Sequence, residues 1–345
     1  MADIAERAGV ALSTVSYVLS GKRRISEDTR ERVLRAIAEL EYRPHTGAQA
    51  LASGTTRAVA LLLPAAHDEL SIMQHAFVAG AAQATSERGY ALTLSTAPAR
   101  AAEVTRLVDA NRADGVILME VELRDRRVER LRSGGYPFSI IGHCEDNSGL
   151  TFVDFDFEHG VELAIRHLMD LGHRRIALFN ETHHSRRRYG YTVRSRAAFE
   201  RLVSEHGLEG SETEVFLDTY KIRDAAREAF RQIRPTAVVA VALAAAVVLA
   251  AAHEEGLRVP NDLSVVGLLS PQLADITNPP LTAVDFPAVE MGRIGAELLI
   301  DRLAKPDQPP SQLLLAPPLT IRESTARPRR RRAARAGAPS VGANR

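Results

Sequence analysis

The chain has 345 residues, of which 45% are hydrophobic and 25% are charged, and it contains one cysteine, Cys144. This length allows two or three domains with sizeable apolar cores, and a lone cysteine excludes an internal disulfide and favours a reducing cytoplasm. The formal net charge is +1, but residues 322–345 hold eight arginines and one glutamate, which leaves 36 basic and 42 acidic side chains elsewhere. Such an acidic body excludes indiscriminate coating of nucleic acid, so nucleic-acid binding requires a local patch.

No basic segment followed by an apolar stretch opens the chain. The longest apolar run, 236–253, is rich in alanine and is preceded by Pro235. We therefore expect neither a signal peptide nor a membrane span, and we interpret the run as a buried strand followed by a helix.

The first 44 residues predict three short helices and no strand. The helix at 2–8 has one apolar face and leads into a glycine turn, the helix at 12–19 places Val15 toward a core, and the third helix begins after Ser26 as N-cap. A short helix, a tight turn and a second helix with an exposed face are typical of the helix-turn-helix, whose second helix enters the DNA major groove. On pattern alone, a protein-docking module remains equally open. The apolar stripe of the third helix is expected at Val33, Ile37 and Leu40.

From residue 58 onward, apolar strands alternate with amphipathic helices. Strands are expected at 58–63, 91–94, 115–118, 138–141, 175–179, 215–217, 237–241 and 263–266, and helices at 77–88, 102–111, 126–131, 157–171, 193–206, 222–233 and 244–255. This alternation predicts parallel sheets covered on both faces, and the two series predict two lobes. Because such folds bind ligands at the carboxyl ends of their strands, we expect a small molecule between the lobes.

Several stretches of sequence carry a more specific resemblance. They are Asp3-Ile-Ala-Glu-Arg-Ala-Gly-Val10, Ser13-Thr-Val-Ser-Tyr-Val-Leu-Ser-Gly21, Tyr42-Arg-Pro44, His167-Leu-Met-Asp-Leu-Gly-His-Arg-Arg-Ile-Ala177 and Gly256-Leu-Arg-Val-Pro-Asn-Asp-Leu-Ser-Val-Val-Gly267. Over residues 2 to about 323 the chain resembles the lactose/galactose repressor (LacI/GalR) family. The resemblance implies an all-α helix-turn-helix head, joined by a hinge helix to an α/β periplasmic-binding-protein-like core of two doubly wound parallel-sheet lobes. It also implies a homodimer, a palindromic double-stranded operator and a small-molecule effector that changes operator affinity.

The expected domain limits follow from this resemblance and from the pattern. Residues 1–44 form the helix-turn-helix domain and 45–57 the hinge helix and linker. The core is 58–323, with one lobe at about 58–154 and 286–323 and the other at about 155–285; residues 324–345 form a basic disordered tail. This tail is expected either to be merely solvated or to hold nucleic acid weakly and without sequence preference.

The expected DNA contacts lie in the second helix, in the loop after it and in the hinge. By resemblance, Leu12, Ser13 and Tyr17 contact base edges, and Thr14 and Ser16 contact phosphates. Lys22, Arg23 and Arg24 are placed to contact phosphates. In the hinge, Gln49 and Leu51 are expected to contact DNA, and Leu51 to insert into the minor groove unless it merely anchors a linker. Two positions depart from the family: Tyr17 stands where arginine is frequent, and Ala11 stands where a serine usually caps the helix.

The expected effector site departs further from the family. Alanine stands at position 242 where an aspartate is usual, Gly267-Leu-Leu-Ser270 lacks two usual acids, and Ser195 replaces an arginine, although Asp156 is retained. These changes leave open an effector more apolar than a sugar, or a core that senses none. The candidate lining residues are Met73, Phe77, His143, Asp156, Arg194, Arg196, Ala242 and Leu269; Met73 and Phe77 are equally compatible with the core, and His143 with an ordinary loop histidine.

Other functions receive less support from the sequence. The chain lacks a phosphate-binding glycine loop, a nucleophile elbow and a paired-carboxylate arrangement, so an enzyme is not expected. No cofactor or metal is expected, because the adjacent His183 and His184 lack helix-spaced partners. The alternatives to an effector-controlled repressor are a periplasmic-type solute-binding protein and a repressor that acts without an effector. We expect a cytoplasmic, nucleoid-associated protein.

Overall fold

The computed structural model describes residues 2–20, 23, 25–40, 55–63, 71–96, 101, 103–182, 189–216, 219–241 and 243–329. By its internal contacts the chain divides into two units, the first made of Met1–Asp154 with Pro287–Leu314 and the second of Phe155–Phe286 with Leu315–Arg345. The expected fold class, a helical head with an α/β core of two parallel-sheet lobes, is confirmed. No helix among the described residues has both the length and the apolar character needed to cross a membrane.

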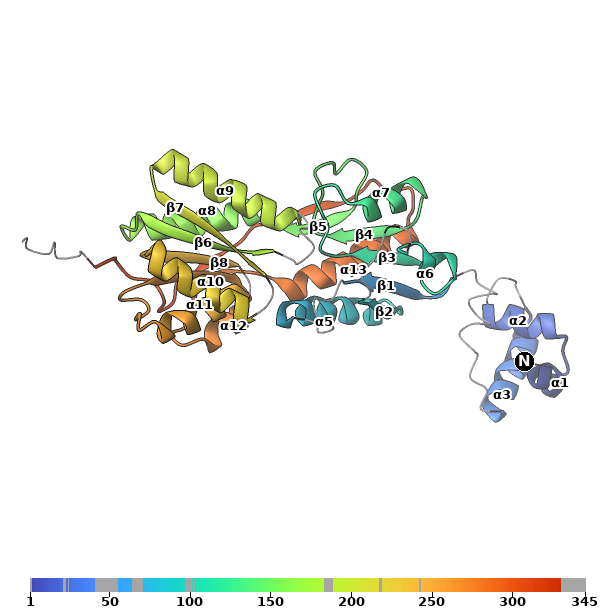
Figure 1. The fold of residues 1–345 in the computed structure, drawn as a ribbon. Coiled ribbons are helices and arrows are strands. Elements are labelled where there is room, and N and C mark those ends of the chain that lie inside the picture. Colours follow the sequence, from blue (N-terminus) through green and yellow to red (C-terminus); the bar gives the residue numbers. More distant parts are fainter. Residues whose placement is uncertain are drawn as a thin grey trace, which may run out of the picture. The chain divides into compact units, whose positions relative to one another are not determined.

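The head consists of α1 (Ala2–Ala8), α2 (Leu12–Ser20) and α3 (Glu27–Glu39) (Figure 1). Its small core contains Ile4, Ala5, Ala8, Val15, Val33 and Ala36, with Val10, Val18 and Ile37 packed against it. Leu40 was expected in this core and is instead exposed, because it follows the last turn of α3. Gly9 has φ +62° in the turn after α1, a backbone conformation that glycine adopts without strain.

Parallel strands form most of the first sheet, in the order β11-β5-β4-β3-β1-β2. The strands are β1 (Ala58–Leu62), β2 (Ala91–Ser95), β3 (Gly115–Leu118), β4 (Phe138–Ile141), β5 (Phe152–Phe155) and β11 (Gln312–Leu315). Apolar side chains of α7 (Arg126–Ser133) cover one face, and α6 (Arg106–Asp109) lies beside them. The other face carries α5 (Ile72–Glu87) and α13 (Ala288–Ala304).

α5 and α13 lie side by side at unusually close range (Figure 1). A Cβ at Gly80 would collide with the carbonyl oxygen of Val289, and one at Gly292 would collide with the carbonyl oxygen of Phe77. The small-residue face of α5 is therefore buried against α13 of the same chain. Only the opposite face of α5, which includes the exposed Ile72, remains accessible.

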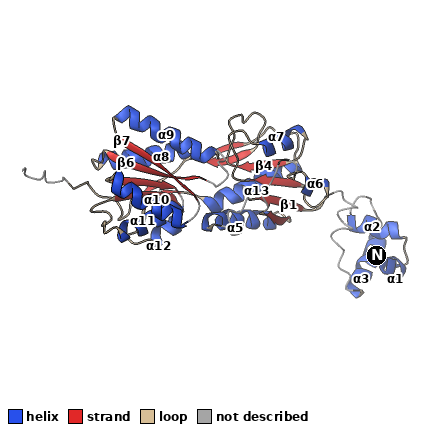
Figure 2. Cartoon of the chain, viewed as in Figure 1, coloured by secondary structure: helices blue, strands red, loops and turns tan. Residues whose placement is uncertain are grey.

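The second sheet has the order β12-β10-β9-β8-β6-β7 and is parallel except for β12. Its strands are β6 (Arg175–Thr182), β7 (Glu209–Phe216), β8 (Ala237–Val241), β9 (Ser264–Leu269), β10 (Thr282–Asp285) and β12 (Leu319–Thr320). Figure 2 shows helices on both sides of it. They are α8 (Phe157–Asp170), α9 (Gly190–His206), α10 (Thr219–Gln232), α11 (Leu243–Glu254) and α12 (Pro271–Ile276).

The segment after β12 is bound to the second sheet by buried polar groups. The Oγ of Ser324 donates to the carbonyl of Val265 over 2.6 Å, and the Nε2 of His173 lies 2.9 Å from the carbonyl oxygen of Ala326. Burial lowers the pKa of the His173 imidazole. Residues 324–326 are therefore structured, and their assignment to a disordered tail was wrong. A second correction concerns β12, which belongs to the second sheet although it was expected in the first lobe.

Candidate nucleic-acid interface and ligand-binding edges

α2 presents a continuous exposed face. The side chain of Leu12 is 51% exposed and that of Tyr17 is 36% exposed; Ser13 is also exposed, whereas Thr14 and Ser16 are half-buried. Val15, on the opposite side, is completely buried in the head's core. The three residues expected to contact base edges thus share the outer face of α2, at the orientation that a helix in a major groove requires.

Polar contacts join α1, and the turn that precedes α2, to α3. Arg32 of α3 donates from Nη2 to the carbonyl of Ala8 over 2.6 Å and to that of Gly9 over 3.1 Å. These two carbonyls lie at the end of α1, so the bonds join the turn between α1 and α2 to α3. A second link between α1 and α3 is the ion pair of Arg7 with Glu39, at 2.6 Å.

Of the three basic residues in the loop after α2, Arg23 is the one that the structure describes. Its guanidinium carbon lies 5.7 Å from the centroid of the Tyr17 ring, and its side chain is exposed. This is the geometry of a cation–π contact. The predicted phosphate contacts Lys22 and Arg24, and the hinge contacts Gln49 and Leu51, lie outside the described residues.

Polar side chains gather at the carboxyl edge of the first sheet. β1 pairs with β2 on one side and β3 on the other, so the chain reverses its direction of winding there; doubly wound folds bind ligands at such a switch point. Glu120 follows β3 at this point, with φ +50°, and accepts a 2.6 Å hydrogen bond from the Nε2 of the buried Gln74 on α5. Neither residue was among the candidates from the sequence.

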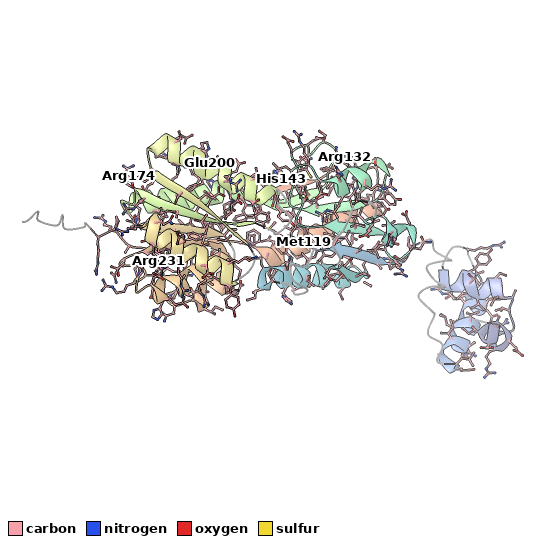
Figure 3. All side chains as sticks on the ribbon, in the orientation of Figure 1. Met119, Arg132, His143, Arg174, Glu200 and Arg231 are labelled. Carbon is pink, nitrogen blue, oxygen red and sulfur yellow. The ribbon has the colours of Figure 1, made fainter. Side chains whose placement is uncertain are left out.

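His143 follows β4 at the same edge (Figure 3). Its Nδ1 is 2.7 Å from Oδ2 of the buried Asp154, and its ring stacks on that of Phe152 with centroids 5.2 Å apart. These contacts hold the imidazole in one orientation with part of its surface exposed. Of the other two candidates in this unit, Phe77 is buried in the core, as its alternative interpretation allowed, and Met73 is half-buried on α5.

A buried ion pair contacts the backbone of this edge. Arg127 donates from Nη2 to Asp125 over 2.7 Å and to the backbone carbonyl of Glu120 over 2.8 Å. Burial alone would raise the pKa of the Asp125 carboxyl, but the hydrogen bond and charge of Arg127 outweigh it and lower that pKa. Arg127 therefore stabilises the left-handed backbone at Glu120 and so the position of its carboxylate.

In the second unit, the candidate residues have defined structural partners. Asp156 is the N-cap of α8 and accepts a hydrogen bond from the backbone N–H of His159 over 2.9 Å. Leu269, at the end of β9, is completely buried. Arg194 and Ser195 lie on α9, half-buried and fully buried respectively, and Ala242 lies outside the described residues.

Arg196 is bound by acidic side chains of β7. Its Nε donates to Glu212 over 2.6 Å, and its Nη2 donates to Glu214; these carboxylates raise the pKa of the guanidinium. The buried Asn180 donates from Nδ2 to the same Glu212 over 2.9 Å. An arginine held in this way is less available for an effector than the sequence suggested.

Comparison with known proteins identifies the family of this chain. The model for bacterial regulatory proteins of the lacI family matches residues 1–45, and that for a periplasmic binding protein-like domain matches residues 165–325. The transcriptional regulator CelR of Thermobifida fusca is 32% identical over 93% of this chain and 96% of its own length. This chain belongs to the lacI family. It is a DNA-binding transcriptional regulator, as the resemblance predicted.

Other lacI-family relatives match over similar lengths. Catabolite control protein A of Priestia megaterium is 28% identical, over 94% of this chain and 98% of its own. Among solved structures, a complex of CelR with cellobiose has a TM-score of 0.70 and 30% identity, covering 93% of this chain and 98% of its own. A lac repressor dimer bound to operator and the anti-inducer ONPF has a TM-score of 0.82 at 24% identity, and the match covers 94% of this chain and 98% of the repressor chain. At this identity the match supports a shared fold and nothing more.

Sequence reasoning missed the polar groups of the first unit, namely Gln74, Glu120, Asp125, Arg127 and Asp154. One signal was present: Glu120 is an acid placed two residues beyond the end of the buried strand Gly115–Leu118. The pairing of Gln74 with Glu120 joins positions 46 apart in the sequence, which no local pattern reveals. Among the described residues, no three His, Cys, Asp or Glu side chains are placed to hold a metal ion.

Proposed function

We propose that this chain is a repressor that binds a palindromic operator as a homodimer, with the outer face of α2 in the major groove, and that a small-molecule effector bound by the core changes its affinity for DNA. The observation that best supports DNA binding by α2 is its burial pattern. Val15 is buried, whereas Leu12, Ser13 and Tyr17 are exposed on the opposite side. A dimer places two such helices in successive major grooves about 34 Å apart. We further propose the domain limits of the sequence analysis with two changes: residues 315–323 join the second lobe, and the C-terminal limit moves to residue 326. We also propose a cytoplasmic, nucleoid-associated location.

For the effector, the polar carboxyl edge of the first unit favours a ligand rich in hydrogen-bonding groups over an apolar one. Glu120, held by Gln74, and His143, held by Asp154, are oriented groups of the kind that fix hydroxyls. The relative that was solved with cellobiose supports a sugar-like ligand. Within the first unit, we place Met73 at the margin of this site and Phe77 behind it.

A repressor that acts without an effector is the second candidate. Its specific support is the second unit, where Arg196 is bound to Glu212 and Glu214 and the family arginine is replaced by the buried Ser195. This candidate predicts that no small molecule alters DNA binding.

Two measurements on the full chain test the proposal. Capture of sheared genomic DNA should enrich fragments that share an inverted repeat, and sedimentation should give a dimer. Thermal unfolding with a panel of sugars, beginning with cellobiose, should identify a ligand that raises the melting temperature and changes the affinity for the captured fragment. Enrichment without any effective ligand would favour the effector-independent repressor, and no enrichment would refute both.

A further inference from the structure

We propose that Arg23 reads a guanine in each operator half-site, with Tyr17 as the platform that positions its guanidinium. This inference rests on the proposed function, because it assigns a base contact to the same DNA-binding face. It changes the expected role of Arg23 from phosphate contact to base readout.

α2 itself lacks the residue types that read purines in the major groove, and Arg23 is one of those types. Its nine residues, Leu-Ser-Thr-Val-Ser-Tyr-Val-Leu-Ser, include no arginine, lysine, asparagine or glutamine. Those four residue types make the bidentate contacts that distinguish guanine and adenine in the major groove. Leu12 can contact a thymine methyl group, and Ser13 can bond to either a donor or an acceptor, so α2 alone has weak means of selecting a purine.

The geometry brings a guanidinium to this face from outside the helix. Arg23 lies three residues beyond the end of α2, and its guanidinium carbon is 5.7 Å from the centroid of the Tyr17 ring. Tyr17 is itself 36% exposed, on the same side as Leu12. The contact therefore holds a cation beside the residues that face the bases.

The cation–π contact with Tyr17 also favours base readout over a simple phosphate contact. A guanidinium that contacts the ring at 5.7 Å is restricted to the neighbourhood of Tyr17, and its planar set of N–H groups can form two parallel bonds to the O6 and N7 of guanine. Holding the side chain in advance reduces the conformational entropy lost on binding. A phosphate contact needs no such orientation, because even a point charge such as that of lysine can make it.

The test is selection of duplexes from a random library by the full chain, followed by sequencing, at two salt concentrations. The wild-type chain is compared with Arg23→Ala, Tyr17→Ala and Lys22→Ala. Lys22→Ala is the matched control, because it removes one positive charge from the same loop. Circular dichroism and thermal unfolding establish that each variant is folded.

We expect Arg23→Ala and Tyr17→Ala to lose preference for guanine at the same base pair of each half-site, by about tenfold. Lys22→Ala should lower affinity for all sequences and leave that preference intact. If Arg23→Ala weakens all sequences equally, or if Tyr17→Ala keeps the wild-type preference for guanine, the inference is wrong while the proposed function stands. If the wild-type chain enriches no motif, the proposed function fails, and the inference with it.

Discussion

At the residue scale, Ala11 limits the stability of the DNA-binding helix. Its carbonyl accepts the first hydrogen bonds of α2, from the N–H groups of Thr14 and Val15, but its side chain has no oxygen to bind another N–H group. We predict that Ala11→Ser stabilises the head by about 1 kcal/mol, because a serine at an N-cap accepts a bond from the first turn. Hydrogen exchange of residues 12–20 in the full chain measures the gain. Ala11→Val, which adds no oxygen, should give none; an equal gain from both variants would contradict this account.

A second residue makes stability depend on pH. Burial lowers the pKa of His173 below its usual 6.5, so between the two values the unfolded chain binds more protons than the folded one. The stability that the neutral imidazole contributes is therefore fully present above pH 6.5 and is lost as the pH falls from that value through the lower pKa of the folded chain. We predict that the melting temperature falls between pH 7.5 and 5.5, and falls less in His173→Gln. An equal fall in both proteins would assign the effect to other groups.

At the scale of elements, the contact between α5 and α13 is the most demanding part of the first unit. A methyl group at Gly80 would meet backbone rather than a flexible side chain, so the helices would have to separate. We predict that Gly80→Ala destabilises the chain by about 1–3 kcal/mol, the cost usual for overpacking, in urea-induced unfolding. Ala79→Ser, on the exposed face of the same helix, should change stability by less than about 0.5 kcal/mol. Similar losses in both would indicate that the close approach is not critical.

The elements that sequence patterns predicted are those whose periodicity is local. The buried strands Gly115–Leu118, Phe138–Ile141 and Ala237–Val241 were located correctly because each is a short apolar run beside turn residues. α13 was missed, although it covers the first sheet, because Gly292 and Gly295 weaken its helical pattern. Gly292 lies against the backbone of Phe77 in α5, and Gly295 lies against the side chain of Ile141 in β4. Both partners are distant in the sequence, so no local pattern reveals why glycine is needed.

At the scale of the whole molecule, the hinge is expected to couple the head to the core. Leu51 lies outside the described residues, so its role as a minor-groove wedge stays a prediction. We predict that Leu51→Ala weakens binding to the captured operator at least tenfold more than binding to random duplex, because a wedge contributes only where DNA bends. Fluorescence anisotropy measures both affinities. Leu313→Ala, at an exposed leucine of the core, is the control, and equal losses on both duplexes would refute the wedge.

The two functional regions differed in how far sequence could predict them. The DNA-binding face follows from one helix of nine residues, whose exposed Leu12, Ser13 and Tyr17 were all anticipated. The effector region depends on tertiary pairs such as Gln74 with Glu120 and His143 with Asp154. Sequence identified His143 but not the carboxylate that orients it, because side chains meet there only after the sheet has formed.

The most direct test of the account is a competition between the inverted repeat enriched from genomic DNA and a scrambled duplex of the same base composition, at physiological salt. Because the outer face of α2 is proposed to contact base edges, the full chain should prefer the repeat by at least about a thousandfold. Tyr17→Ala with Leu12→Ala should remove most of that preference and keep the dimer. Equal affinity of the wild-type chain for repeat and scramble would contradict the proposal that this face reads DNA sequence.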